Sequence, residues 1–202
     1  MKNILLIVDP QNDFITGTLP VVGAEEKMKL LAQYLQDKAR IYDYICITLD
    51  SHTEYHCSFT ENGGIWPKHC ISNTVGWDLP GYLDAQLWDL EHVRFYHKGY
   101  INNKEEYSIF ANDNDGRDLS NLIQQTIKEG DDVYVDICGI AGDYCVLETL
   151  KGLTKIMGNQ YISVLSDLTA SIDGGEKLTA YAEANEISII TNSFNNLTPY
   201  EL

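Results

Sequence analysis

The chain has 202 residues, of which 44% are hydrophobic and 10% aromatic, so it can bury one substantial core. It carries 14 Lys and Arg against 30 Asp and Glu, and this formal net charge of −16 argues against nucleic acid or an anionic membrane surface as a partner. The same charge is compatible with a monomer or with a homo-oligomer. Because no repeat, low-complexity tract or linker interrupts the sequence, we expect residues 1–202 to form one domain.

Neither a membrane span nor a signal peptide is expected. No apolar run approaches the ~20 residues that cross a bilayer. The apolar run nearest the N-terminus, residues 4–8, has five positions and is followed by Asp9. The five cysteines are an odd number, and Cys46 and Cys138 fall inside apolar runs that we expect to be buried strands. A disulfide framework is therefore not expected, and a reducing cytoplasm is the predicted location.

Short β-rich runs alternate with segments of helical character along the chain. In chain order we expect strand 4–8, helix 24–40, strand 44–49, strand 93–96, helix 119–128, strand 133–138, helix 145–157, strand 161–165, helix 177–185 and strand 187–191. This alternation predicts an α/β fold in which helices cover both faces of a parallel sheet. The stretch 51–91 is expected to be irregular, and ordered loops of that length are often functional.

Chemically capable side chains follow four of the expected strands. In open parallel sheets, ligands bind beyond the carboxyl ends of the strands. Asp9 follows the first strand, Asp50 and His52 follow the second, Lys98 follows the third, and the segment 139–145 follows the fourth. We therefore expect these groups to converge on one cleft.

Cys145 is the candidate nucleophile of that cleft. It stands in GIAGDYCV, where a glycine-containing turn leads from a strand into a helical run. A helix start lowers the pKa of a thiol, and such turns expose nucleophiles in other enzymes. Asp9 could accept the thiol proton, and the Lys98 ammonium could stabilise the thiolate. Viewed singly, these residues are better explained as a core cysteine, a turn aspartate and a surface lysine, respectively. Their shared position at strand ends favours chemistry.

A second cluster combines one aspartate with histidines, in DSHTEYHCSF and WPKHC. Asp50 and His52 at a strand end, completed by a loop histidine, would form a nitrogen and oxygen shell suited to Zn²⁺, Fe²⁺ or Mn²⁺. Two alternatives stay open. The histidines could be loop residues without a metal, or a closed structural zinc site could use Cys57 or Cys70, although neither belongs to a CxxC pair.

Seven motifs occur in a fixed order over nearly the whole chain: DPQNDF, DSHTEYHCSF, WPKHC, HKGY, EEYSIF, GIAGDYCV and DLTAS. Together they resemble the nicotinamidase (pyrazinamidase) family of the isochorismatase-like cysteine hydrolases. The resemblance implies a three-layer doubly wound fold with a six-stranded parallel sheet between helices. It also implies metal-dependent hydrolysis of nicotinamide to nicotinate and ammonia through a Cys145 thioester, a reaction of NAD salvage.

The resemblance further implies roles for single residues. The implied catalytic triad is Asp9, Lys98 and Cys145. The implied oxyanion hole consists of the backbone amides of Ala141 and Cys145, next to a cis peptide between Ile140 and Ala141.

One divalent transition metal ion is implied as the cofactor, with zinc ahead of iron or manganese. Its implied ligands are Asp50, His52 and His69, with waters completing the shell and His56 as a candidate fourth ligand. Phe14 and Trp66 match aromatic positions that line the nicotinamide pocket.

Three other interpretations compete with this one. A related amidase acting on a carbamoyl or ureido group would share the triad but generally lacks the metal cluster. An isochorismatase would lack the nucleophilic cysteine, and a catalytically silent metal-binding protein on the same fold would have no need of an intact triad. One position departs from the resemblance, because family members commonly have threonine where this chain has Gly142.

Overall fold

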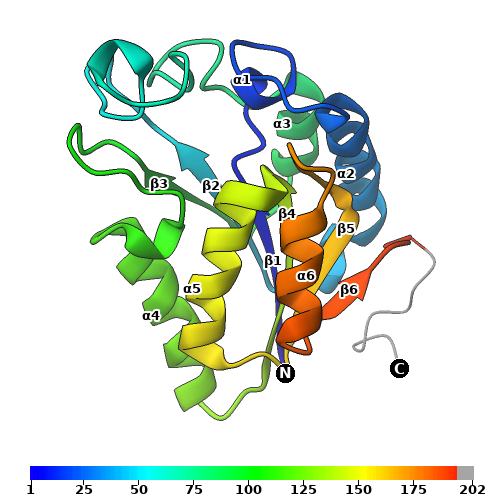
Figure 1. Ribbon diagram of the computed structural model, residues 1–202. Coiled ribbons are helices and arrows are strands. Elements are labelled where there is room, and N and C mark those ends of the chain that lie inside the picture. The colour runs from blue at the N-terminus through cyan, green and yellow to red at the C-terminus, as the bar shows by residue number, and fades with distance from the viewer. Residues whose placement is uncertain (195–202) are drawn as a thin grey trace.

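The computed structural model describes residues 1–194, which form a six-stranded sheet of order β3-β2-β1-β4-β5-β6 (Figure 1). All neighbouring strands are parallel. The strands are β1 (Lys2–Val8), β2 (Tyr44–Asp50), β3 (Val93–Lys98), β4 (Val133–Ile140), β5 (Ile162–Ala170) and β6 (Ser188–Ile190). The predicted doubly wound parallel sheet is confirmed.

Helices form a layer on each face of this sheet. In the described part of the chain they are α1 (Asn12–Ile15), α2 (Ala24–Lys38), α3 (Gly81–Leu87), α4 (Asp115–Lys128), α5 (Leu147–Met157) and α6 (Glu176–Ala184). Figure 1 shows α4, α5 and α6 in front of the sheet and α2 and α3 behind it. Within residues 1–194, no helix has the length and apolarity needed to span a bilayer.

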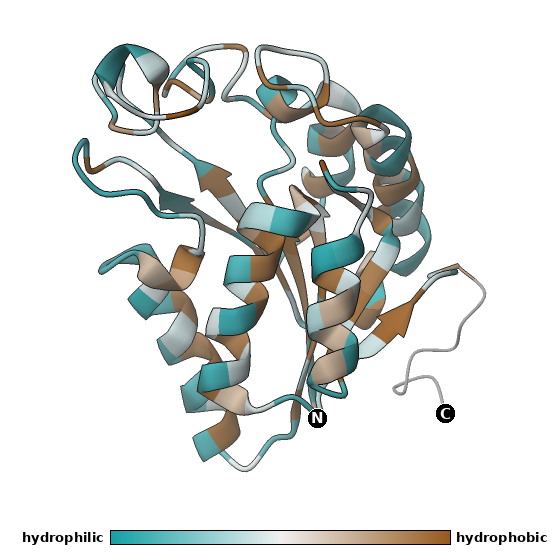
Figure 2. Cartoon of the chain, in the orientation of Figure 1, coloured by the Kyte–Doolittle hydropathy of each residue, from teal (hydrophilic) through white to brown (hydrophobic). Residues whose placement is uncertain are grey.

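The strands are apolar on both sides, which explains why they read as continuous hydrophobic runs. In β1, Leu5 and Ile7 belong to the core under α2 and α3, whereas Leu6 and Val8 belong to the core under α4, α5 and α6. All four are at most 1% exposed, and burial of each such side chain contributes about 1.5–3 kcal/mol. Figure 2 shows this pattern as brown strands between helices whose outer faces are teal.

The segment predicted to be irregular contains an α-helix that the sequence did not reveal. Helix α3 lies within 51–91, begins with a glycine and spans two turns, so its local helical propensity is weak. It buries Leu83 and Leu87 in the same core as α2. Tertiary packing therefore stabilises this helix, as is usual for short helices.

β5 is also longer than predicted, ending at Ala170 instead of residue 165. The pairing register of β4 with β5 shifts between Ile137 and Gly139, and the ladder then resumes with Thr169 and Ala170. Gly139 has φ of +121°, and a Cβ there would lie 2.1 Å from the Val8 carbonyl oxygen. This close approach joins the ends of β1 and β4, where the next residues are candidate functional groups.

β1 and β4 are the central pair at which the strand order changes direction. β2 and β3 lie on one side of this pair, and β5 and β6 lie on the other. The loops that leave β1 and β4 therefore diverge, and such a switch point opens a crevice at the carboxyl edge of the sheet. The loops after β1, β2, β3 and β4 gather at that edge (Figure 1).

Candidate active site

Asp9, Lys98 and Cys145 meet at this edge although they come from three separate segments of the chain. The Lys98 ammonium nitrogen lies 2.8 Å from Asp9 Oδ2 and 3.5 Å from Cys145 Sγ. Asp9 and Lys98 are fully buried, and Cys145 is 7% exposed. Asp9 adopts a left-handed φ of +47°, and the Thr48 hydroxyl donates to its Oδ1 at 2.6 Å. The structure thus brings together the three residues that the sequence placed at strand ends.

The charges of this group determine the state of the thiol. Burial raises the pKa of Cys145 well above its ordinary value, the Lys98 ammonium opposes that shift, and the Asp9 and Asp50 carboxylates add to it. Burial also raises the pKa of Asp9, against the pull of Lys98. For Lys98, burial favours the neutral amine, but Asp50 and Asp9 outweigh it and hold the pKa well above its usual range. These shifts favour a protonated thiol and a charged Lys98 ammonium beside the Asp9 carboxyl group.

Cys145 lies in a π-helical turn, Gly142–Val146, that precedes α5. The helix predicted to begin at Cys145 therefore begins two residues later, and π turns of this kind are frequent at functional sites. The amides of Tyr144 and Val146 both donate to the Ala141 carbonyl oxygen at 3.1 Å. The peptide between Ile140 and Ala141 is cis, as the family resemblance implies. Ala141 and Cys145 both line the pocket, and the oxyanion role of their amides stays a prediction.

Asp50, His52 and His69 form a second group beside the first. One ligand atom from each lies within 4.8 Å of the others, and all three residues are buried. His52 Nδ1 is 2.7 Å from the Gly99 carbonyl oxygen, and His69 Nδ1 is 2.8 Å from the carbonyl oxygen of Pro67. Because a carbonyl only accepts, each Nδ1 carries the hydrogen. With Nδ1 so occupied, Nε2 is the atom of each ring whose lone pair is available to a metal ion.

These lone pairs face a carboxylate, which is the arrangement that a cation stabilises. Asp50 Oδ2 lies 2.9 Å from His52 Nε2 and 3.5 Å from His69 Nε2, and the buried His52 Nε2 has no aligned hydrogen-bond partner. Although burial opposes it, the Lys98 ammonium holds the pKa of Asp50 well below its usual range, so the carboxylate stays charged. Backbone carbonyls that orient ligating imidazoles are typical of metal centres. The site fits a divalent metal ion.

His56 contacts this group without directing a free nitrogen at it. Its ring stacks on that of His52 with a centroid distance of 4.0 Å. Its Nε2 donates to the Lys104 carbonyl oxygen at 3.0 Å, and its Nδ1 accepts from the Ser58 amide at 3.2 Å. His56 as a fourth ligand stays a prediction, and it requires a ring movement that breaks both hydrogen bonds.

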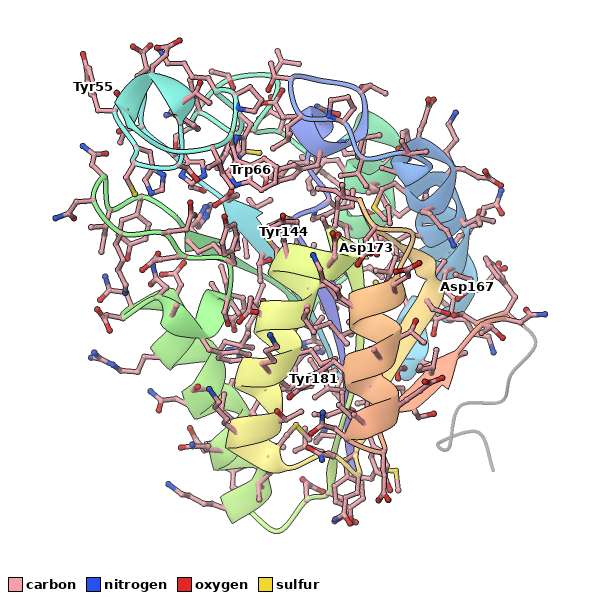
Figure 3. All side chains as sticks on the ribbon, viewed as in Figure 1. Tyr55, Trp66, Tyr144, Asp167, Asp173 and Tyr181 are labelled. Carbon is pink, nitrogen blue, oxygen red and sulfur yellow. The ribbon has the colours of Figure 1, made fainter. Side chains whose placement is uncertain are left out.

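Aromatic side chains surround the pocket beyond Cys145. Trp66 donates through Nε1 to the Tyr107 hydroxyl at 3.0 Å and meets Tyr144 edge-on at 5.1 Å between ring centroids. Figure 3 shows Trp66 above Tyr144 at the upper end of α5. Phe14 lines the same pocket and lies 5.4 Å from the His69 ring. Tyr107 and Tyr144 also line this pocket and were not predicted from the sequence, although Tyr107 belongs to the EEYSIF motif and Tyr144 directly precedes the nucleophile.

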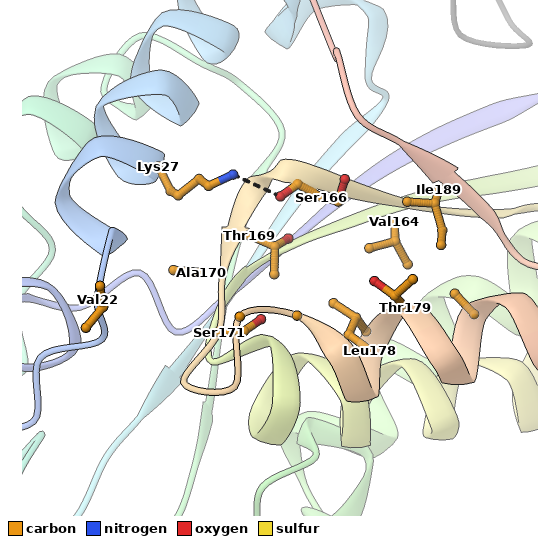
Figure 4. Close-up of a pocket in the computed structure, with 13 residues that line it drawn as sticks. Val22, Lys27, Val164, Ser166, Thr169, Ala170, Ser171, Leu178, Thr179 and Ile189 are labelled. Carbon is orange, nitrogen blue, oxygen red and sulfur yellow. Dashed lines mark hydrogen bonds between the residues drawn. The ribbon is translucent and has the colours of Figure 1, made fainter.

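Gly142, the position that departs from the family pattern, faces two side chains from the end of β5. A Cβ at Gly142 would lie 1.9 Å from Ser171 Oγ and 3.1 Å from Thr169 Cγ2. Ser171 and Thr169 also line a cavity of about 350 Å³ near the start of α6 (Figure 4). Ser171 therefore fills the space that a side chain at position 142 would occupy.

Gly142→Ala is expected to destabilise the protein by about 1–3 kcal/mol, because the new methyl group overpacks against Ser171. Introducing the same change in a Ser171→Gly background should cost less, since the obstructing hydroxymethyl group is gone. Denaturant unfolding of the four proteins in a double-mutant cycle measures this coupling, which should exceed ~0.5 kcal/mol. Equal costs of Gly142→Ala in both backgrounds would show that Ser171 does not fill this space.

Together, the fold and site define the protein as a hydrolase built on a doubly wound parallel sheet. The sequence matches the family model of the isochorismatase domain over residues 3–194. It is 34% identical to the nicotinamidase/pyrazinamidase of Mycobacterium tuberculosis over 190 residues, which cover 92% of this chain and 95% of that protein. The chain therefore belongs to the isochorismatase domain family, as its motifs predicted.

Solved structures agree with this assignment. PnC1 of L. infantum, determined in complex with nicotinate, has a TM-score of 0.80 and 29% identity, with 94% of this chain and 92% of that chain covered. The pyrazinamidase of Pyrococcus horikoshii, determined in complex with zinc, has a TM-score of 0.75 and 29% identity. That alignment covers 95% of this chain and all of the pyrazinamidase chain.

Proposed function

We propose that this protein hydrolyses nicotinamide to nicotinate and ammonia. The observation that carries the proposal is a buried cysteine in contact with a lysine–aspartate pair, directly beside a group of two histidines and a carboxylate, under an aromatic pocket. A flat heteroaromatic amide suits such a pocket. The nicotinamidase relative from M. tuberculosis and the nicotinate complex of PnC1 support this substrate.

The proposed chemistry uses the three converging side chains as a triad. Asp9 takes the proton from Cys145 Sγ, and the thiolate attacks the carboxamide carbon. The amides of Ala141 and Cys145 stabilise the oxyanion that develops. The carbon–nitrogen bond then breaks, and ammonia leaves with the proton held by Asp9. Asp9 next takes a proton from water, whose oxygen attacks the thioester carbon. As the carbon–sulfur bond breaks, Asp9 returns this proton to the sulfur, which regenerates the thiol, and the nicotinic acid released ionises to nicotinate.

Lys98 holds this group together throughout the cycle. Its ammonium contacts Asp9 Oδ2 at 2.8 Å, Asp50 Oδ1 at 3.2 Å and Cys145 Sγ at 3.5 Å. It therefore offsets the negative charge that moves between the carboxylate and the sulfur. Because it also contacts Asp50, it links the nucleophile to the second group of side chains.

Asp50, His52 and His69 would hold the metal ion, for which we propose zinc, with iron or manganese as alternatives. When bound, the ion supplies coordination positions for the pyridine nitrogen and for water. The zinc complex of the P. horikoshii pyrazinamidase supports this choice. Phe14 and Trp66 would enclose the pyridine ring.

Ammonia release from nicotinamide is the test of the proposed function. We expect turnover by the protein as purified, about one equivalent of divalent transition metal per chain, and loss of turnover in chelator without unfolding. A carbamoyl or ureido amide in parallel assays should release far less ammonia. Activity on the ureido compound alone, or full activity with no metal, would assign the protein to the metal-free amidases instead. No ammonia from either substrate would leave a catalytically silent member of the family.

We also propose that residues 1–202 act as one unit in the cytoplasm, within NAD salvage. The family match over residues 3–194 and a sheet that runs from Lys2 to Ile190 support a single unit. All five cysteines are unpaired, and Cys46 and Cys138 lie in the buried strands β2 and β4. Unpaired thiols are typical of proteins from a reducing compartment.

A further inference from the structure

The turn after β3 joins Lys98, which contacts Cys145, to the proposed metal ligand His52. Gly99 follows Lys98 directly, and its carbonyl oxygen accepts the hydrogen of His52 Nδ1 at 2.7 Å. The position tolerates only glycine, because φ is +75° and a Cβ would lie 2.5 Å from Asp50 Oδ1 and 2.7 Å from His52 Cε1. A glycine has the widest backbone freedom of any residue, so its carbonyl must be held by other contacts.

Glu106 holds the backbone of this glycine through its amide. Its Oε2 accepts from the Gly99 amide at 2.9 Å and from Asn112 Nδ2 at 2.9 Å, and its Oε1 lies 2.8 Å from the Lys104 ammonium. The residue is only 1% exposed, and a buried carboxylate is costly unless it is fully engaged. This carboxylate lies outside the proposed triad and outside the group of ligands, so the proposed reaction does not account for it.

The peptide between Lys98 and Gly99 is clamped from both sides. The Ser51 amide donates to the Lys98 carbonyl oxygen at 2.8 Å, and the Gly99 amide donates to Glu106 on the opposite side. These two hydrogen bonds fix the plane of the peptide between Lys98 and Gly99, from which the Gly99 carbonyl extends toward His52. Without Glu106, a buried amide would lose its partner, and the turn would be free to move.

We propose that Glu106 is a positioning residue that fixes the tautomer and orientation of His52 through Gly99, and so sets the affinity of the site for its metal. This proposal rests on the metal site of the proposed function. Hydrogen-bonded partners one step removed from a metal typically change metal affinity 10–100-fold when they are lost. Here Glu106 acts through the backbone of Gly99, and the length of its side chain matters more than its charge.

Two nearly isosteric variants separate reach from charge. Glu106→Gln keeps a carbonyl oxygen at the same length and can still accept from the Gly99 amide, whereas Glu106→Asp keeps the charge but is one methylene shorter. Zn²⁺ dissociation constants, from competition with a chromogenic chelator, should rise at least ~10-fold for Glu106→Asp and by less than that for Glu106→Gln. Visible absorption of the Co²⁺-loaded proteins reports the ligand geometry independently and should change mainly in Glu106→Asp.

The controls distinguish positioning from general stability. Glu129→Asp makes the same change at an exposed site on the end of α4 and should leave Zn²⁺ affinity unchanged. Thermal unfolding of the metal-free proteins measures any structural cost separately. A Glu106→Asp protein that binds Zn²⁺ like the parent, or a Glu106→Gln protein that loses as much affinity, would overturn the proposal. If the parent itself binds no metal, the metal site of the proposed function fails instead.

Discussion

Replacing Cys145 with alanine is expected to reduce ammonia release from nicotinamide by more than ~10⁴-fold, because removal of a nucleophile leaves only binding and electrostatic contributions to the rate. The change removes one sulfur atom from the floor of the pocket, where the side chain is 7% exposed. The fold and the binding of nicotinamide should therefore be retained. Steady-state turnover, thermal unfolding and equilibrium binding measure these three outcomes.

A second cysteine of the same region provides the matched control. Cys57 is half-buried and does not line the pocket, so Cys57→Ala should keep turnover near that of the parent. Mass spectrometry of the parent protein, quenched shortly after mixing with nicotinamide, should detect an acyl adduct on the peptide that contains Cys145. Turnover of Cys145→Ala within tenfold of the parent would rule out the covalent mechanism.

Lys98→Met is expected to reduce turnover by at least ~10²-fold, which is the low end for a positioned electrostatic or proton-transfer group. Burial raises the pKa of the Cys145 thiol, and Lys98 is the group that lowers it. Loss of the ammonium should raise this pKa further, so less thiolate exists at any given pH. Alkylation by iodoacetamide at neutral pH should therefore slow, and the midpoint of its pH profile should move upward.

The same change carries a structural cost that must be measured separately. Lys98 lies between Asp9 and Asp50, and breaking a buried ion pair typically destabilises a protein by about 3–5 kcal/mol. Alkylation is therefore measured well below the unfolding temperature of the variant. Lys29→Met, at an exposed lysine paired with Glu25 on α2, is the control and should leave turnover and the pH profile of alkylation unchanged. An alkylation profile identical to that of the parent would show that Lys98 does not influence the thiol.

Local hydrophobic patterns in the sequence predict the main elements of the fold. Runs such as ILLIV in β1 are apolar at every position because residues on both faces enter a core, and that pattern indicates a parallel sheet covered twice. Helix α3 lacked such a signal, because its two buried leucines are stabilised by contacts with segments distant in sequence. The bulge at Gly139, which lengthens β5, depends equally on the approach of Val8.

Asp9, Lys98, Cys145, Asp50, His52 and His69 were identifiable from the sequence because each directly follows a strand or stands in a recognisable motif. Their convergence could be predicted because parallel strands end at the same edge of the sheet. The sequence by itself therefore determined the fold class, the family and which candidate residues would converge at the sheet edge. Only the tertiary structure decided which hydrogen bonds the rings of His52, His56 and His69 make and which groups Ser171 and Glu106 contact. These features depend on which backbone carbonyl or amide lies within about 3 Å of a side chain, and such contacts join segments whose spacing along the chain carries no pattern.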